Sequence, residues 1–131
     1  MKNFKEFIVS EGMQENNICE RMLFMVVQAR MWHFLTKSYS KHEAFDEFYE
    51  KLGKHVDSVI EASIPNFGDI QPTATRYSFA KVDNAVNDIK IFKMDVISWY
   101  NSKEESPGVA SLIENVLADC DSVIYKLENL D

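Results

Sequence analysis

The predicted fold of this chain depends on the stretch His33-Phe-Leu-Thr-Lys-Ser-Tyr-Ser-Lys-His42-Glu-Ala-Phe-Asp46, where a serine-containing break separates two segments of helical apolar spacing. Asp57 and Glu61 follow farther along the second segment. Two imidazoles and three carboxylates therefore occur at helical spacings in one short part of the sequence. Each is a potential metal ligand, and four-helix bundles build di-metal sites from side chains that project from facing helices.

Apolar spacing on both sides of this break predicts four principal helices in the 131 residues. The first three are expected at about 16–37, 40–63 and 80–102. The fourth is expected to begin at Ser106-Pro107, an N-cap and first-turn pair, and its apolar stripe continues to Leu127.

The second helix carries signals at both of its ends. Ser40 and Glu43 have the spacing of a capping box, which predicts a start at Ser40. Pro65, Asn66 and Gly68 are residues that break helices, and they predict its end.

The first helix has an unusually wide apolar arc. Its core side includes Met22, Ala29 and His33, and other apolar residues lie beside that side (Leu23, Val27 and Phe34). An arc of this width predicts a helix that is nearly surrounded by protein.

The connection over residues 65–80 is long for a compact bundle and would reach from one end of a bundle to the other. Two helical hairpins joined by one long crossover form the ferritin-like arrangement of a four-helix bundle. We therefore expect an all-α, ferritin-like single domain over residues 1–131. Residues 1–12 can form an N-terminal appendage, and a short helix near residues 2–9 is one option for it.

Composition and charge exclude several classes of function. Nearly half of the residues (46%) are hydrophobic and Gly and Pro are scarce, which is typical of a globular protein. The formal net charge of -7 argues against non-specific binding to nucleic acid or to anionic membranes. No run of about eighteen apolar residues predicts a membrane span.

The cysteines and the N-terminal sequence bear on location. Cys19 and Cys120 lie far apart in the sequence and fit buried thiols of a reducing compartment better than a disulfide framework. The first twelve residues lack the long apolar region of a secretory signal. A cytoplasmic location is therefore expected.

The candidate ligands of the second helix lie along one flank of its apolar stripe. With about 100° per residue and Phe45 at zero, four of them fall in a band from about 60° to 160° (His42, Asp46, Asp57 and Glu61). The first two are one helical turn apart, and so are the last two, so that each pair can chelate one ion. The band lies at the edge of the core and not at its centre.

His33 faces inward near the end of the first helix. Imidazole and carboxylate donors together suit iron, manganese or zinc. A structural interpretation stands beside this one, because an inward histidine is often a satisfied core residue and acidic residues beside an apolar stripe are often a solvated edge. His55 is expected at the surface, away from the ligand band.

The stretch from His33 to Lys37, followed by Lys41 to Leu52 and by His55 to Ala62, resembles the first two helices of Dps-type miniferritins. In that family, a histidine near the end of the first helix acts together with a histidine, two aspartates and a glutamate of the second. These residues bind iron between two subunits. The resemblance implies a di-iron site, with manganese or zinc as other occupants, at five residues: His33, His42, Asp46, Asp57 and Glu61.

The same resemblance implies a homo-oligomer with a two-fold interface. His33, His42 and Asp46 would come from one subunit, and Asp57 with Glu61 would come from its mate. A ligand band on the flank of a helix is what an intersubunit site requires. The sequence has no lysine-rich N-terminal tail, and no nucleic-acid or membrane partner is expected.

The chain is also similar to a group of short tailed-phage proteins, through Thr36-Lys37-Ser38, Phe48-Tyr49-Glu50 and Tyr125-Lys126-Leu127. Its opening, residues 1–8, is similar to the capsid-targeting start of internal head proteins of T-even-like phages, with residues 9–12 as a processing point. For a phage protein, the location would be the host cytoplasm or the interior of the virion.

Two hypotheses follow. The first is a miniferritin-like protein that binds Fe(II) at an intersubunit site and oxidises it, as a ferroxidase-type oxidoreductase. The second is a non-catalytic helical bundle that serves as a phage structural or accessory protein.

Overall fold

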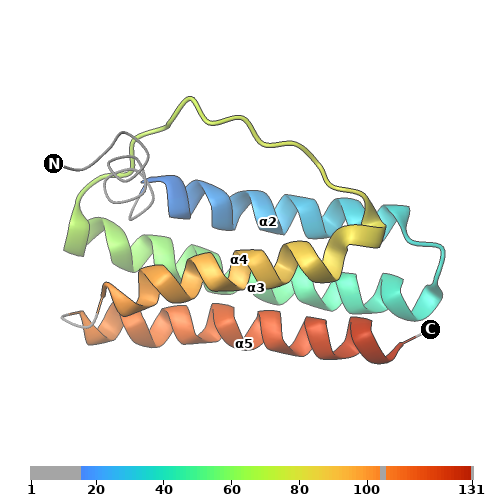
Figure 1. The fold of residues 1–131 in the computed structure, drawn as a ribbon. Coiled ribbons are helices and arrows are strands. Elements are labelled where there is room, and N and C mark those ends of the chain that lie inside the picture. Colours follow the sequence, from blue (N-terminus) through green and yellow to red (C-terminus); the bar gives the residue numbers. More distant parts are fainter. Residues whose placement is uncertain (1–15, 104–105, 131) are drawn as a thin grey trace, which may run out of the picture.

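The computed structural model describes residues 16–103 and 106–130, and the described residues are helical without any strand. Four α-helices lie side by side along their length, as Figure 1 shows. Their bounds are α2 (Asn16–Leu35), α3 (Tyr39–Phe67), α4 (Ala85–Asn101) and α5 (Pro107–Asn129), and the 3₁₀ turn η1 (Val82–Asn84) precedes α4. The prediction of an all-α fold is confirmed, and the expected appendage over residues 1–12 lies outside the described residues.

The order of the helices in space follows from two hairpins and one long connection. α2 turns back into α3, and α4 turns back into α5 (Figure 1). Residues 68–81 have no regular structure and run along the bundle from the end of α3 to the start of α4. The predicted crossover therefore joins opposite ends of the bundle. α3 packs extensively on both α2 and α5, whereas α2 and α4 touch much less.

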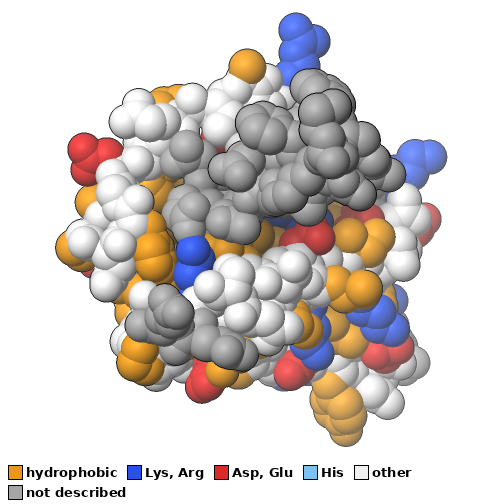
Figure 2. Space-filling view, turned by 60° about the vertical axis from the view of Figure 1, so that its left-hand side comes forward, with side chains coloured by type: hydrophobic (Ala, Val, Ile, Leu, Met, Phe, Trp, Pro, Cys, Tyr) orange, Lys and Arg blue, Asp and Glu red, His pale blue; other side chains and the backbone are white. Residues whose placement is uncertain are grey.

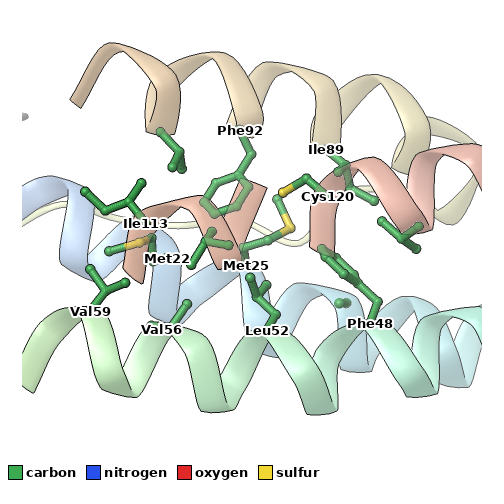
Figure 3. Packing of buried hydrophobic residues seen from close by; sticks show 14 of the residues in the cluster. Met22, Met25, Phe48, Leu52, Val56, Val59, Ile89, Phe92, Ile113 and Cys120 are labelled. Atoms are coloured by element: carbon green, nitrogen blue, oxygen red, sulfur yellow. The ribbon is translucent and has the colours of Figure 1, made fainter. Parts of the chain in front are cut away.

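The interior is filled by apolar side chains from all four helices, and Figure 3 shows them meeting between the ribbons. Each helix contributes residues at three- and four-residue spacing, which places them on one face. On α3, the buried apolar residues are Ala44, Phe45, Phe48, Leu52, Val56 and Val59. These positions confirm the predicted stripe and leave the flank with the candidate ligands outside the core.

The start of α3 differs from the prediction. The N-cap is Ser38 and not Ser40, since the Ser38 side chain accepts a hydrogen bond from the Lys41 backbone N–H. Glu43 does not close a capping box, because its Oε1 accepts a hydrogen bond from the Tyr39 hydroxyl at 2.9 Å.

The end of α3 also differs, because the helix continues through Pro65 to Phe67. A proline in a helix deprives the carbonyl four residues earlier of its N–H partner. Side-chain donors serve neighbouring carbonyls here: Ser63 Oγ donates to Val59 O at 2.7 Å, and Asn66 Nδ2 donates to Ala62 O at 2.7 Å. Gly68, with a positive φ of 100°, then ends the helix.

The crossover is held against one stripe of α2 with four-residue spacing. Glu20 accepts hydrogen bonds from the Thr73 backbone N–H and hydroxyl, and the Phe24 ring stacks on Tyr77. One turn farther along, Gln28 Oε1 accepts from the Ala80 N–H at 2.6 Å, and Trp32 Nε1 donates to the Ala80 carbonyl at 2.9 Å. Gln28 and Trp32 are buried where they meet the crossover, and Trp32 also belongs to the hydrophobic core.

An adjacent arc of α2 stays uncovered in the single chain. Leu23 is 47% exposed, Val27 51% and Phe34 66%. The expectation of a helix nearly surrounded by protein is therefore wrong for this arc. Other apolar side chains are also exposed, among them Met94 of α4 at 68%.

At the end of the bundle where α3 and α4 both finish, Phe67 of α3 meets Lys103, which follows α4. Lys103 is 8% exposed, and its Nζ lies 4.1 Å from the centroid of the Phe67 ring. Figure 2 brings this end forward and shows charged side chains of both signs dispersed among hydrophobic ones. None of the helices within residues 16–103 and 106–130 combines the length and apolarity needed to span a bilayer.

Candidate metal half-site at the α2–α3 corner

The turn between α2 and α3 brings His33 and His42 face to face. Their ring centroids are 3.7 Å apart and the ring planes are inclined by 25°. Both side chains are half-buried. The turn is short, since α2 ends at Leu35 and α3 begins at Tyr39, so the two histidines lie within about one helical turn of the corner.

The two imidazoles exchange hydrogen bonds with the two backbones. His33 Nδ1 lies 2.9 Å from the His42 carbonyl oxygen, and His42 Nδ1 lies 2.8 Å from the His33 carbonyl oxygen. A carbonyl only accepts, so each Nδ1 must carry the proton and donate it. In the neutral ring, Nε2 is then the atom with the lone pair.

This tautomer is compatible with metal binding through Nε2. Metal-binding histidines usually donate one ring N–H to a carbonyl or carboxylate, which fixes the ring and leaves the other nitrogen to bind the metal. The hydrogen bonds of both rings within the described residues go through Nδ1. The same two bonds also close the corner, so they support a purely structural role equally well.

Tyr49 contacts both Asp46 and His33. The Tyr49 hydroxyl donates to Asp46 Oδ1 at 2.7 Å, and the Tyr49 ring centroid lies 5.4 Å from that of His33 in an edge-to-face arrangement. The Arg30 guanidinium carbon lies 5.4 Å from the Tyr49 ring centroid. The sequence did not single out Tyr49 or Arg30 as residues of this site. Their spacing is nevertheless a signal, because Tyr49 lies three residues from Asp46 and Arg30 lies three residues from His33, so that each pair is adjacent on its helix.

Asp57 and Glu61 do not reach this corner. Asp57 lies eleven residues beyond Asp46 on α3, which is about 16 Å along a helix. Both side chains are exposed. Accordingly, no three histidine, cysteine or carboxylate side chains in residues 16–103 and 106–130 converge closely enough to hold a metal ion. A single chain therefore presents two separate halves of the predicted ligand set.

The two halves nevertheless share one outer face with the exposed apolar arc of α2. A Cβ on Gly53 of α3 would lie 3.6 Å from Val26 of α2, which marks where these helices face each other. Projection from this contact, at about 100° per residue, turns Leu23 and Val27 toward the same outer side as Asp57 and Glu61. Apolar and acidic side chains thus lie next to each other on the α2–α3 face.

A second polar cluster on the other side of α3 corrects the expectation that His55 is a surface residue. His55 Nδ1 lies 2.5 Å from Asp119 Oδ2 of α5, and Asp119 is only 8% exposed. No local pattern predicts this pair, because its partners lie 64 residues apart in the sequence.

Glu47 lies near this pair and binds two lysines, Lys51 of α3 and Lys126 of α5. Their hydrogen bonds lower the pKa of Glu47 to about 2. The cluster ties α3 to α5 and contributes no ligand to the corner.

The cysteines are not part of either cluster's chemistry. Cys19 and Cys120 are both buried, as expected. Burial raises the pKa of the Cys120 thiol to about 12, which disfavours the thiolate that acts as nucleophile and metal ligand.

Comparison with curated proteins and with solved structures gave no significant match. A family model does match, over residues 33–127, a range that begins at the first of the two stacked histidines. This range covers more than half of the chain, and the chain therefore belongs to DUF5856, a family of unknown function.

Proposed function

We propose that the chain is a ferritin-like, miniferritin-type protein that binds Fe(II) at a site shared by two copies and oxidises it. The observation that carries this proposal is the pair of stacked histidines, whose Nδ1–H groups are fixed by carbonyls and whose Nε2 atoms hold the lone pairs. The crossover between two hairpins supports the ferritin-like topology.

A second copy would complete the donor set. In this arrangement, His33, His42 and Asp46 of one chain meet Asp57 and Glu61 of the other. The apolar arc with Leu23, Val27 and Phe34 supports such an interface, because all three residues remain exposed and the first two project to the same side as Asp57 and Glu61. Burying it against the same arc of a second copy would remove it from water.

The residues would act on iron in simple ways. Neutral imidazoles and carboxylates bind Fe(II), and the carboxylates offset the increased charge of Fe(III). With peroxide as oxidant, two Fe(II) supply the two electrons that reduce one hydrogen peroxide, together with two protons, to two waters. Oxygen is the other candidate oxidant. Since the imidazoles must be neutral, metal binding should weaken below about pH 6.

The second candidate function is a metal-free helical bundle with a structural or accessory role in a phage. The reciprocal hydrogen bonds of His33 and His42 favour this candidate, because they explain both half-buried rings without a metal. The two candidates differ in one respect that is easy to measure, since only the first needs Nε2.

The test is Fe(II) binding and oxidation by the purified protein, followed by elemental analysis and light scattering. We expect a dimer or larger assembly that carries iron, and loss of oxidation in His42→Ala and in Asp57→Ala. Glu43→Ala is the matched control, because Glu43 is an exposed carboxylate next to His42 outside the ligand set. A metal-free monomer, or full activity of both ligand variants, would overturn the proposal.

A further inference from the structure

A cleft opens at the end of the bundle where α3 and α4 begin (Figure 1). Its volume is about 370 Å³, which is within the range of small-molecule sites. The lining comes from the turn between α2 and α3, the first turns of α3 and α4, η1 and the last turn of α5. None of the five candidate metal ligands lines this cleft, so it is separate from the site proposed above.

Buried apolar side chains form the inner part of the cleft. Phe45 of α3 is 1% exposed and Leu127 of α5 is 6% exposed, so the core holds both of them in place. Ala85 and Val86 add apolar surface from the first turn of α4. Because these side chains come from three helices of the bundle, the apolar part is preformed and can bury an aliphatic or aromatic group.

The charged residues of the lining are two lysines and one aspartate. Lys37 and Lys41 come from the turn and the start of α3, and Asp83 comes from η1. Among the described residues, none of these three side chains forms an ion pair or a side-chain hydrogen bond. The lining therefore carries a surplus of one positive charge, in a chain whose formal net charge is -7. Such a local surplus favours an anion over a cation.

We infer that this cleft binds a small organic anion with one negative charge and an apolar body, such as a medium-length aliphatic carboxylate. Lys37 and Lys41 would bind the carboxylate, and the aliphatic part would contact Phe45 and Leu127. A single negative charge matches the surplus of the lining, whereas a polyanion would meet repulsion from Asp83. The inference does not rest on the proposed function.

The experiment is a titration of the full chain with octanoate, followed by two-dimensional NMR of its backbone amides. We expect shifts concentrated at the turn between α2 and α3, at η1 and at the start of α4. Octyltrimethylammonium has the same chain with the opposite charge and should leave these amides unshifted. Hexanoate has two fewer CH₂ groups and should bind about 3- to 15-fold more weakly, because each buried CH₂ contributes to affinity.

Charge variants test the assignment of the lysines. The double variant Lys37→Gln with Lys41→Gln should bind octanoate about 5- to 20-fold more weakly than the unaltered protein. Asp83→Asn should bind it about two- to five-fold more tightly, since it removes the one negative charge of the lining. Lys54→Gln is the matched control, because Lys54 is an exposed lysine of α3 outside the cleft, and its affinity should be unchanged within about two-fold.

Three results would each overturn the inference. The first is a lack of amide shifts with octanoate. The second is a set of shifts centred on the exposed arc of Leu23, Val27 and Phe34, which would show binding to a general apolar surface. The third is unchanged affinity in both the double lysine variant and Asp83→Asn, with thermal unfolding showing that these variants are folded.

Discussion

The pair formed by His55 and Asp119 offers a quantitative test of how α3 and α5 are held together. Asp119 is 8% exposed and His55 Nδ1 lies 2.5 Å away, whereas the His55 side chain is 34% exposed. His55→Leu would remove the partner and leave a buried carboxylate without it. Breaking a fully buried pair costs about 3 to 5 kcal/mol, and an unsatisfied buried group costs about 1 to 3 kcal/mol.

Because His55 is partly open to water, we expect a loss of about 2 kcal/mol in the free energy of unfolding. For a chain of this size, that loss corresponds to a decrease of about 7 °C in Tm. Urea unfolding at neutral pH and thermal unfolding by circular dichroism measure both quantities. The control is the exposed neighbour Lys54, whose change to Ala should alter stability by less than about 0.5 kcal/mol.

A double variant, His55→Leu with Asp119→Leu, separates pairing from packing. Replacing both polar groups removes the stranded carboxylate, so the double variant should be more stable than His55→Leu alone. The reasoning is refuted if His55→Leu lowers the free energy of unfolding by less than about 0.5 kcal/mol. It is also refuted if the loss in the double variant equals the sum of the losses in His55→Leu and Asp119→Leu.

Two further predictions concern other links between helices. Glu47→Gln removes a carboxyl group whose pKa is about 2 in the folded protein, against an ordinary value of 4.5. The ionised carboxylate stabilises the fold fully above pH 4.5, and this stabilisation is lost as the pH falls from about 4.5 to about 2. Because the Glu47 side chain is 41% exposed, we expect Glu47→Gln to lower the free energy of unfolding by about 1 kcal/mol at pH 6, and this difference should disappear by pH 2 in urea unfolding. A difference that does not depend on pH would contradict this prediction. Trp32→Phe removes the hydrogen bond from the indole to the Ala80 carbonyl in the crossover. The free energy of unfolding should fall by about 1 to 2 kcal/mol, and amide hydrogen exchange in residues 73–80 should become faster. Unchanged exchange there would contradict the anchoring role of Trp32.

Periodicity was sufficient to predict the helices and their core faces, because burial imposes the same spacing on each helix. The ends of α3 were less predictable. Ser38 and Ser40 are equally good caps by residue type, and only the folded turn selects Ser38. Pro65 predicts the end of the helix, but α3 continues for one more turn to Phe67 and ends at Gly68, which has a positive φ.

The site was predictable only in its local part. The spacing between His42 and Asp46 follows from one helical turn, whereas the stacking of His33 on His42 depends on how tightly the corner turns. The pair of His55 and Asp119 joins residues from distant parts of the chain, so spacing could not reveal it. Nor can apolar spacing distinguish an arc that faces the chain's own core from one that stays exposed, as Leu23, Val27 and Phe34 do.

The proposed function requires that each metal site combine ligands from two copies of the chain. Two variants would test it directly: one carries His42→Ala, and the other carries Asp57→Ala with Glu61→Ala. Neither assembles a complete site alone. In a dimer of one copy of each, one of the two sites regains all five ligands.

The decisive measurement is therefore the Fe(II) bound and oxidised by the two variants refolded together. We predict negligible activity for each variant alone, and recovery of about a quarter of the unaltered capacity in the equal mixture, as random pairing requires. A mixture no more active than its separate components would contradict the claim, provided that the unaltered protein binds and oxidises iron in the same assay.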